Sequence, residues 1–103
     1  MENIKNIPDL MVELLESNIT IETMEITARG VEIINEISDY AEQTELFNAN
    51  KDRGEMFAGS TAQQVFGYML DRVVNAPAIL FRDTSVLLIM PYFRQKLREE
   101  GKM

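Results

Sequence analysis

The sequence predicts an all-α protein, a compact bundle of four to five helices formed by a single domain over residues 1–103. Three observations predict this class. Apolar residues recur at intervals of three and four along most of the chain, cap-forming residues stand near the starts of these stripes, and 46% of the residues are hydrophobic. A length of 103 residues is typical of one domain with a packed core.

The first helix is expected close to the start of the chain. Its apolar stripe consists of Ile7, Leu10, Met11, Leu14 and Leu15. Pro8 suits the first turn of a helix, because its missing N–H has no partner there in any case. Ser17 and Asn18 are expected to end this helix after about three turns.

The next stripe predicts a long helix from about Thr20 to Phe47. The stripe consists of Ile26, Gly30, Ile33, Ile37, Tyr40, Thr44 and Phe47. Residues 19–24 would also fit a strand, since several are β-branched and partly alternate with polar residues. The sequence offers such a strand no evident partner, so we prefer the helix. Gly30 either lets another backbone approach closely or marks a bend.

A loop and a well-marked helix are expected after this segment. Residues 48–59 are rich in Asn, Asp and Gly and predict a loop, from which Met56 and Phe57 are expected to dock on the core. Ser60 as N-cap and Gln63 three residues later form a capping box that opens the helix. Its stripe consists of Ala62, Val65, Phe66, Met69, Leu70, Val73 and Val74. The helix is expected to end just before Pro77, because a residue that precedes a proline avoids the helical conformation.

The C-terminal part is expected to hold one helical turn over residues 77–81 and a last helix from about Ser85 to Glu100. Its stripe consists of Val86, Leu87, Met90, Phe93 and Leu97. Pro91 falls inside this helix and should kink it or split it in two, and we prefer one kinked helix. Gly101 fits the position just after the helix end.

Charge is distributed unevenly along the chain. The net charge is −7, with −9 on residues 1–50 and +2 on residues 51–103. A net acidic protein is repelled by phosphate backbones, which disfavours nucleic acid as a partner. Four basic residues lie near the C-terminus: Arg94, Lys96, Arg98 and Lys102. We interpret them as complements of the helix dipole rather than as a phosphate-binding or membrane-binding surface.

The composition excludes several classes of site. The chain has no His and no Cys, so it can form no Ser-His-Asp triad, thiol nucleophile, zinc-thiolate site or disulfide. Residues 54–61 resemble a phosphate-binding loop only superficially, because its lysine is missing. We therefore expect no enzymatic activity, no cofactor and no metal. The missing Cys, the polar N-terminus and the lack of a long apolar stretch predict a cytoplasmic protein without a membrane partner.

Two surfaces are candidates for binding a partner. Glu32, Glu36 and Asp39 share one exposed helix face. Leu88, Ile89, Tyr92 and Phe93 belong to a segment, residues 86–93, that would be apolar nearly all round as a helix. Such a helix is either the centre of the bundle or buries its second face against a partner.

We therefore expect a small acidic protein that binds another protein and self-associates through the apolar segment, as a homo-oligomer. Its class would be an accessory, assembly or inhibitor protein of the type that phages encode, on analogy alone. One alternative is a nucleic-acid mimic whose acidic helix face blocks a DNA- or RNA-handling enzyme. A further alternative is a nucleic-acid-binding regulator that uses the basic C-terminal helix.

Overall fold

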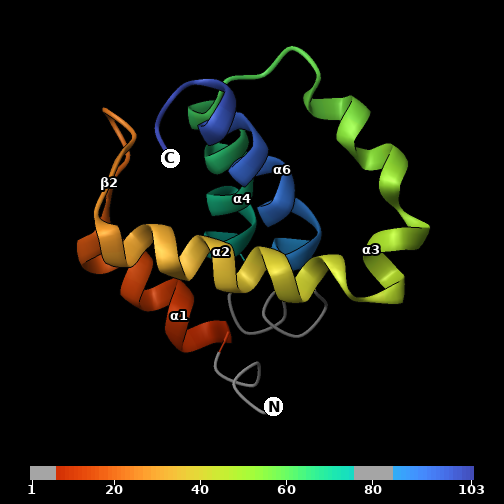
Figure 1. Cartoon of the computed structure of the whole chain (residues 1–103), viewed down its shortest axis with the longest axis horizontal. Coiled ribbons are helices and arrows are strands. Elements are labelled where there is room, and N and C mark those ends of the chain that lie inside the picture. Colours follow the sequence, from red (N-terminus) through yellow and green to blue (C-terminus); the bar gives the residue numbers. More distant parts are fainter. Residues whose placement is uncertain (1–6, 76–84) are drawn as a thin grey trace.

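The structure, a computed structural model, describes residues 7–75 and 85–103. This part of the chain is helical apart from one small two-stranded sheet (Figure 1), and the molecule measures 30 × 29 × 27 Å. Its α-helices are α1 (Ile7–Glu13), α2 (Ala28–Glu42), α3 (Glu45–Ala49), α4 (Ala62–Asn75) and α6 (Ser85–Glu99). The predicted all-α bundle is confirmed. The helical turn expected over residues 77–81 lies outside the described residues.

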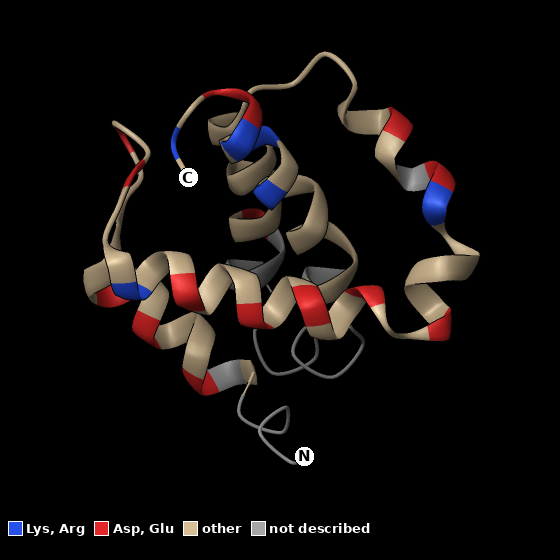
Figure 2. Cartoon of the chain, viewed as in Figure 1, with Lys and Arg blue, Asp and Glu red and all other residues tan. Residues whose placement is uncertain are grey.

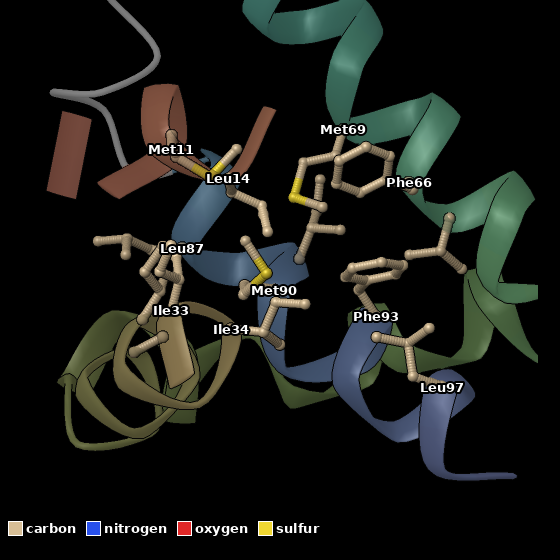
Figure 3. Packing of buried hydrophobic residues seen from close by; sticks show 14 of the residues in the cluster. Met11, Leu14, Ile33, Ile34, Phe66, Met69, Leu87, Met90, Phe93 and Leu97 are labelled. Carbon is tan, nitrogen blue, oxygen red and sulfur yellow. The ribbon is translucent and has the colours of Figure 1, made fainter. Parts of the chain in front are cut away.

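Helix α6 lies at the centre of the bundle, because it packs against both α2 and α4. Figure 3 shows its side chains meeting those of the N-terminal helix, α2 and α4 in one core. The rings of Phe93 on α6 and Phe66 on α4 are 4.8 Å apart between centroids. Fully buried members of the core include Met11, Leu14, Ile33, Ile34, Phe66, Met69, Met90, Phe93 and Leu97.

The N-terminal helix follows the prediction. Helix α1 continues directly into η2 (Leu14–Asn18), one π-helical turn, and the helical segment ends at Asn18 as expected. Leu10, Met11 and Leu14 from the predicted stripe are buried against the rest of the core.

The prediction of one long helix from about Thr20 to Phe47 is wrong. Residues 19–26 form a hairpin in which β1 (Ile19–Thr20) pairs antiparallel with β2 (Glu25–Ile26). The strand partner is therefore local rather than distant in sequence. Met24 closes the turn with a φ of 57°, a left-handed conformation that is costly for a side chain other than glycine. Its own side chain is buried in the core, which offsets that cost.

Two threonine caps divide the remainder of that segment. Thr27 Oγ1 accepts a hydrogen bond from Gly30 N–H (2.9 Å) at the start of α2, and Thr44 Oγ1 accepts one from Phe47 N–H (3.1 Å) at the start of α3. Thr44 is in an extended conformation, as a cap residue must be, so α2 ends at Glu42 and the chain turns before α3. The stripe of apolar residues continues across this break without marking it.

Gly30 is a point of close approach rather than a bend. A Cβ atom at this position would lie 2.6 Å from the carbonyl oxygen of Asn18 at the end of η2. Any side chain there would therefore push η2 and the start of α2 apart.

The segment predicted as a loop over residues 48–59 is largely helical. It contains the end of α3 and a 3-10 helix, η3 (Lys51–Phe57). Phe57 is buried as expected, but Met56 is 51% exposed, so its predicted docking on the core is wrong. Short helices of this kind lack a periodic stripe that would reveal them in the sequence.

The capping box at the start of α4 is shifted by one residue. Thr61 Oγ1 accepts from Gln64 N–H (3.1 Å), and Gln64 Oε1 accepts from Thr61 N–H (2.9 Å). Thr61 and Gln64 therefore replace the predicted pair Ser60 and Gln63, with the same reciprocal chemistry.

Helix α6 runs through Pro91 as one helix, so the single helix that we preferred over a split is confirmed. At its end, Lys102 N–H donates to Leu97 O (2.8 Å) and Gly101 N–H donates to Arg98 O (3.2 Å). Gly101 has a φ of 75°, which completes a Schellman motif at the position expected for a glycine.

Candidate interaction surface

The three carboxylates predicted to bind a partner lie on α2, opposite its buried face. Glu32 and Asp39 are exposed and Glu36 is half-buried, while Ile33, Ile34 and the rest of the inner stripe are fully covered. Figure 2 shows acidic residues recurring along the length of α2. The expectation that these residues share an outward face is confirmed by this arrangement; what they bind stays a prediction.

One edge of this face is tied to the N-terminal helix by Arg29. Its guanidinium donates to both carboxylate oxygens of Glu13, Nε to Oε2 at 2.7 Å and Nη2 to Oε1 at 3.0 Å. Its Nη1 also donates to Glu32 Oε1 at 3.2 Å. The hydrogen bonds from Arg29 hold the pKa of Glu13 below its usual value of 4.5, against the opposing effect of desolvation, and the same contacts raise the pKa of Arg29.

The other edge is tied to α6 by Arg94. Its side chain is only 7% exposed. Its Nη1 donates to Asn35 Oδ1 (3.1 Å) and Asp39 Oδ1 (2.8 Å), and its Nη2 lies 3.1 Å from Glu42 Oε1. Arg94 is therefore a buried cation that joins the central helix to the polar side of α2.

This role of Arg94 was not predicted from the sequence, because Arg94 was treated there as one of four basic residues near the C-terminus. The sequence did contain an indication of its position. Arg94 follows Met90 by four residues and precedes Leu97 by three, and both of these residues are fully buried. A residue at that spacing lies on the core side of the helix, where an arginine needs acidic partners.

We define the acidic face as Glu13, Glu32, Glu36, Asp39 and Glu42 together with Arg29 and Arg94. Its net charge is −3, from five carboxylates and two guanidinium groups. Four of the five carboxylates pair with an arginine. Glu36 has no ion pair among the described residues, and its spacing from Glu32 and Asp39 places it between the two arginine-bound edges.

The apolar segment predicted for self-association lies inside the chain. Leu88 is 7% exposed, Ile89 2% and Phe93 0%, so none of the three presents an accessible apolar surface. For Ile89 and Phe93, which belong to the core cluster, the physical reason is the central place of α6, which packs against both α2 and α4. A helix that is apolar nearly all round was expected either at the centre of the bundle or with its second face against a partner. The structure places α6 at the centre of the bundle.

Tyr92, the fourth residue of that set, is half-buried beneath the α3–η3 segment. Its hydroxyl donates to Lys51 O (3.1 Å), and its ring centroid lies 5.5 Å from that of Phe47. The structure thus separates the predicted residues into an outward set on α2 and an inward set on α6.

The basic C-terminal residues contact the chain itself. Besides Arg94, the ammonium of Lys96 lies 3.3 Å from Ala58 O, and that of Lys102 lies 3.1 Å from Thr23 O. Glu100 Oε2 accepts from Ala62 N–H (2.8 Å) at the start of α4. Lys96 and Arg98 lie in the last turn of α6, as expected for complements of the helix dipole, and the contacts of Arg94, Lys96 and Lys102 add structural roles to that placement.

No protein-family model, curated protein or solved structure matches this chain. Within residues 7–75 and 85–103, no group of three or more acidic side chains is arranged to hold a metal ion. In the same two stretches, no helix has the length and apolar character needed to cross a membrane.

Proposed function

We propose that this protein acts by binding another protein through the acidic face, without catalysis, as a small accessory, assembly or inhibitor protein of the cytoplasm. The observation that carries this proposal is the pairing pattern on that face. Arginines from the chain itself hold both edges in place, while Glu36 at its centre keeps an uncompensated charge. A fixed surface with a net charge of −3 is suited to a cationic surface on a partner protein.

The fold also supports a rigid presentation of this surface. Because Glu13 belongs to α1, and Arg94 to α6, the ion pairs connect three helices across the face. A surface that is already ordered loses little conformational entropy when a partner binds. Charge complementarity of this type acts mainly on the association rate and on the choice of partner.

The test begins with affinity capture, using the purified full chain as bait, followed by measurement of the dissociation constant for the captured partner. Glu36→Lys is expected to weaken binding by about tenfold or more, equivalent to about 1.4 kcal/mol. Glu22→Lys is the matched control, since it makes the same charge change at an exposed position on the hairpin. Equal affinities of the two variants for the partner would contradict the proposed role of the acidic face.

A salt titration separates this proposal from the nucleic-acid mimic. The two arginines interrupt the carboxylates of the acidic face, whereas a phosphate backbone is uninterrupted. We therefore expect binding to persist in part between about 50 and 300 mM salt. A complete loss of binding over that range, with a DNA- or RNA-handling enzyme as the captured partner, would favour mimicry. The regulator using the basic tail has less support, because Arg94, Lys96 and Lys102 contact the chain itself.

Self-association stays a prediction, now without the apolar segment as its surface. Light scattering on the eluate of a size-exclusion column would report the mass directly. We expect more than one chain per particle at micromolar concentration, and a mass of 11.8 kDa across that range would contradict the homo-oligomer.

A further inference from the structure

A cleft of about 450 Å³ lies between η3 and α6, away from the acidic face. Figure 1 shows the chain from α3 to α4 arching around one side of the bundle, with α6 inside the arch. The residues that line the cleft are Lys51, Gly54, Glu55, Phe57 and Ala58 from the arch and Tyr92, Gln95, Lys96 and Glu99 from α6. A volume of this size is within the range of small-molecule sites in proteins.

The aromatic part of the cleft is fixed by close contacts. Tyr92 is held by its hydrogen bond to Lys51 O, and its ring lies 6.1 Å from that of Phe57 between centroids. A Cβ atom at Gly54 would be 2.7 Å from Tyr92 Cε1, so only a glycine lets η3 approach α6 this closely. The two rings thus form an ordered apolar surface between the charged residues.

Each wall of the cleft carries one cation and one anion. Lys51 and Glu55 belong to η3, and Lys96 and Glu99 belong to α6. The side chain of Lys96 is 14% exposed, and among the described residues its ammonium contacts Ala58 O at 3.3 Å and Glu99 Oε1 at 3.9 Å. An ammonium has three N–H donors, so this group still has donor capacity for an acceptor in the cleft.

We infer that this cleft binds a zwitterionic ligand of the amino-acid or short-peptide class. The carboxylate of the ligand would be met by Lys96 and Lys51, its ammonium by Glu55 and Glu99, and an apolar side chain by the ring of Tyr92. Two lysines alone would indicate an anion, but the two glutamates make the net charge of the lining zero. A ligand that carries both charges satisfies all four groups, whereas a simple anion or cation is opposed by two of them.

The inference goes beyond the proposed function and is independent of it. None of the residues of the acidic face lines the cleft. A variant in the cleft can therefore lose ligand binding without any change in partner binding, and a variant of the acidic face can lose partner binding without any change in ligand binding.

The test is a titration of the isotope-labelled full chain, followed by the backbone amide signals in NMR spectra. The probes are L-phenylalanine and the dipeptide glycyl-L-phenylalanine, and the matched control is N-acetyl-L-phenylalanine amide, which has the ring but neither charge. We expect saturable shifts at Gly54, Glu55 and Gln95 with a dissociation constant below about 1 mM for at least one charged probe. The two arms identify whether a free amino acid or a peptide is bound.

Two variants test the assigned contacts. Lys96→Met keeps the aliphatic stem and removes the ammonium, and Glu55→Gln changes an exposed residue whose side chain has no hydrogen-bond or ion-pair partner among the described residues. Each is expected to weaken binding of the charged probe by about fivefold or more, while Glu22→Gln on the hairpin leaves it unchanged. The absence of saturable shifts with both charged probes, or equal binding of the uncharged control, would overturn the inference. Unchanged affinity in Glu55→Gln would also overturn it, whether or not Lys96→Met folds.

Discussion

Gly30→Ala is the substitution that most directly tests the packing of η2 against α2. Gly30 occupies the first turn of α2, and its N–H donates to the cap residue Thr27. In an unobstructed helix, replacing glycine by alanine stabilises the fold by up to about 1 kcal/mol. Here the added Cβ would lie 2.6 Å from both Asn18 O and Ile26 Cγ2, whereas ordinary contact begins at 3.4 Å.

The expected magnitude follows from what must move. The Asn18 carbonyl is main chain and also accepts a hydrogen bond from Thr27 N–H at 3.1 Å, so it cannot rotate away. Overpacking of this kind costs about 1–3 kcal/mol, and a weakened hydrogen bond adds about 0.5–1.5 kcal/mol. After a helical gain of about 1 kcal/mol is subtracted, we expect Gly30→Ala to lower the free energy of unfolding by about 0.5–3.5 kcal/mol.

Urea unfolding followed by circular dichroism measures this difference, with Gly67→Ala as the matched control. Gly67 lies inside α4, and a Cβ there would meet nothing within 4 Å. We expect the control to be stabilised by up to about 1 kcal/mol, so that the two identical substitutions change stability in opposite directions. If Gly30→Ala proves at least as stable as the unmodified chain, the close approach of η2 to α2 is refuted.

Three further substitutions test the ion pairs and the core. Arg94→Ala should lower the free energy of unfolding by about 1–3 kcal/mol in urea, less than a fully buried pair because Asp39 and Glu42 remain exposed to water. Glu13→Gln should destabilise the fold at neutral pH, because the lowered pKa of Glu13 means that its charged form favours folding. The difference in thermal midpoint between this variant and the unmodified chain should vanish as the pH falls through the folded-state pKa of Glu13. A constant difference down to about pH 2 would contradict this expectation. Ser38→Ala should raise the free energy of unfolding by about 0.5–2 kcal/mol, because Ser38 Oγ is buried and, among the described residues, has no hydrogen-bond partner.

The elements that could be predicted from the sequence are those whose apolar period is matched by burial. Among the residues whose burial the structure describes, the N-terminal helix, α4 and α6 each bury most of the stripe that predicts them, so spacing alone is sufficient. The spacing of apolar residues could not locate the break between α2 and α3 at Thr44, because Ala41 and Phe47 on either side are both buried and continue the pattern. The break depends on a side-chain cap, and a threonine is only one of several residues that form such caps.

The hairpin and the interface residues could not be predicted for a different reason. Strands of two residues carry no measurable alternation, and Met24 adopts a turn conformation that its type does not indicate. Leu88, Ile89 and Phe93 belong to a helix that is apolar nearly all round. The sequence alone does not indicate whether the second side of such a helix is covered by the same chain or by a partner. For Ile89 and Phe93 that surface is supplied by the core that α6 forms with α2 and α4, which are distant from each other in the sequence.

The ion pairs on the acidic face determine which of its residues can report on function. Asp39 and Glu42 hold Arg94, and Glu13 and Glu32 hold Arg29, so substitution of any of these four removes an ion pair within the chain as well as changing the surface charge. A loss of binding in such a variant would have two explanations. Glu36 belongs to the same face but takes no part in these ion pairs, so its substitution changes the charge seen by a partner while leaving the helix contacts intact. A partner that distinguishes Glu36→Lys from Glu22→Lys therefore responds to the position of the charge, since the two variants have the same net charge.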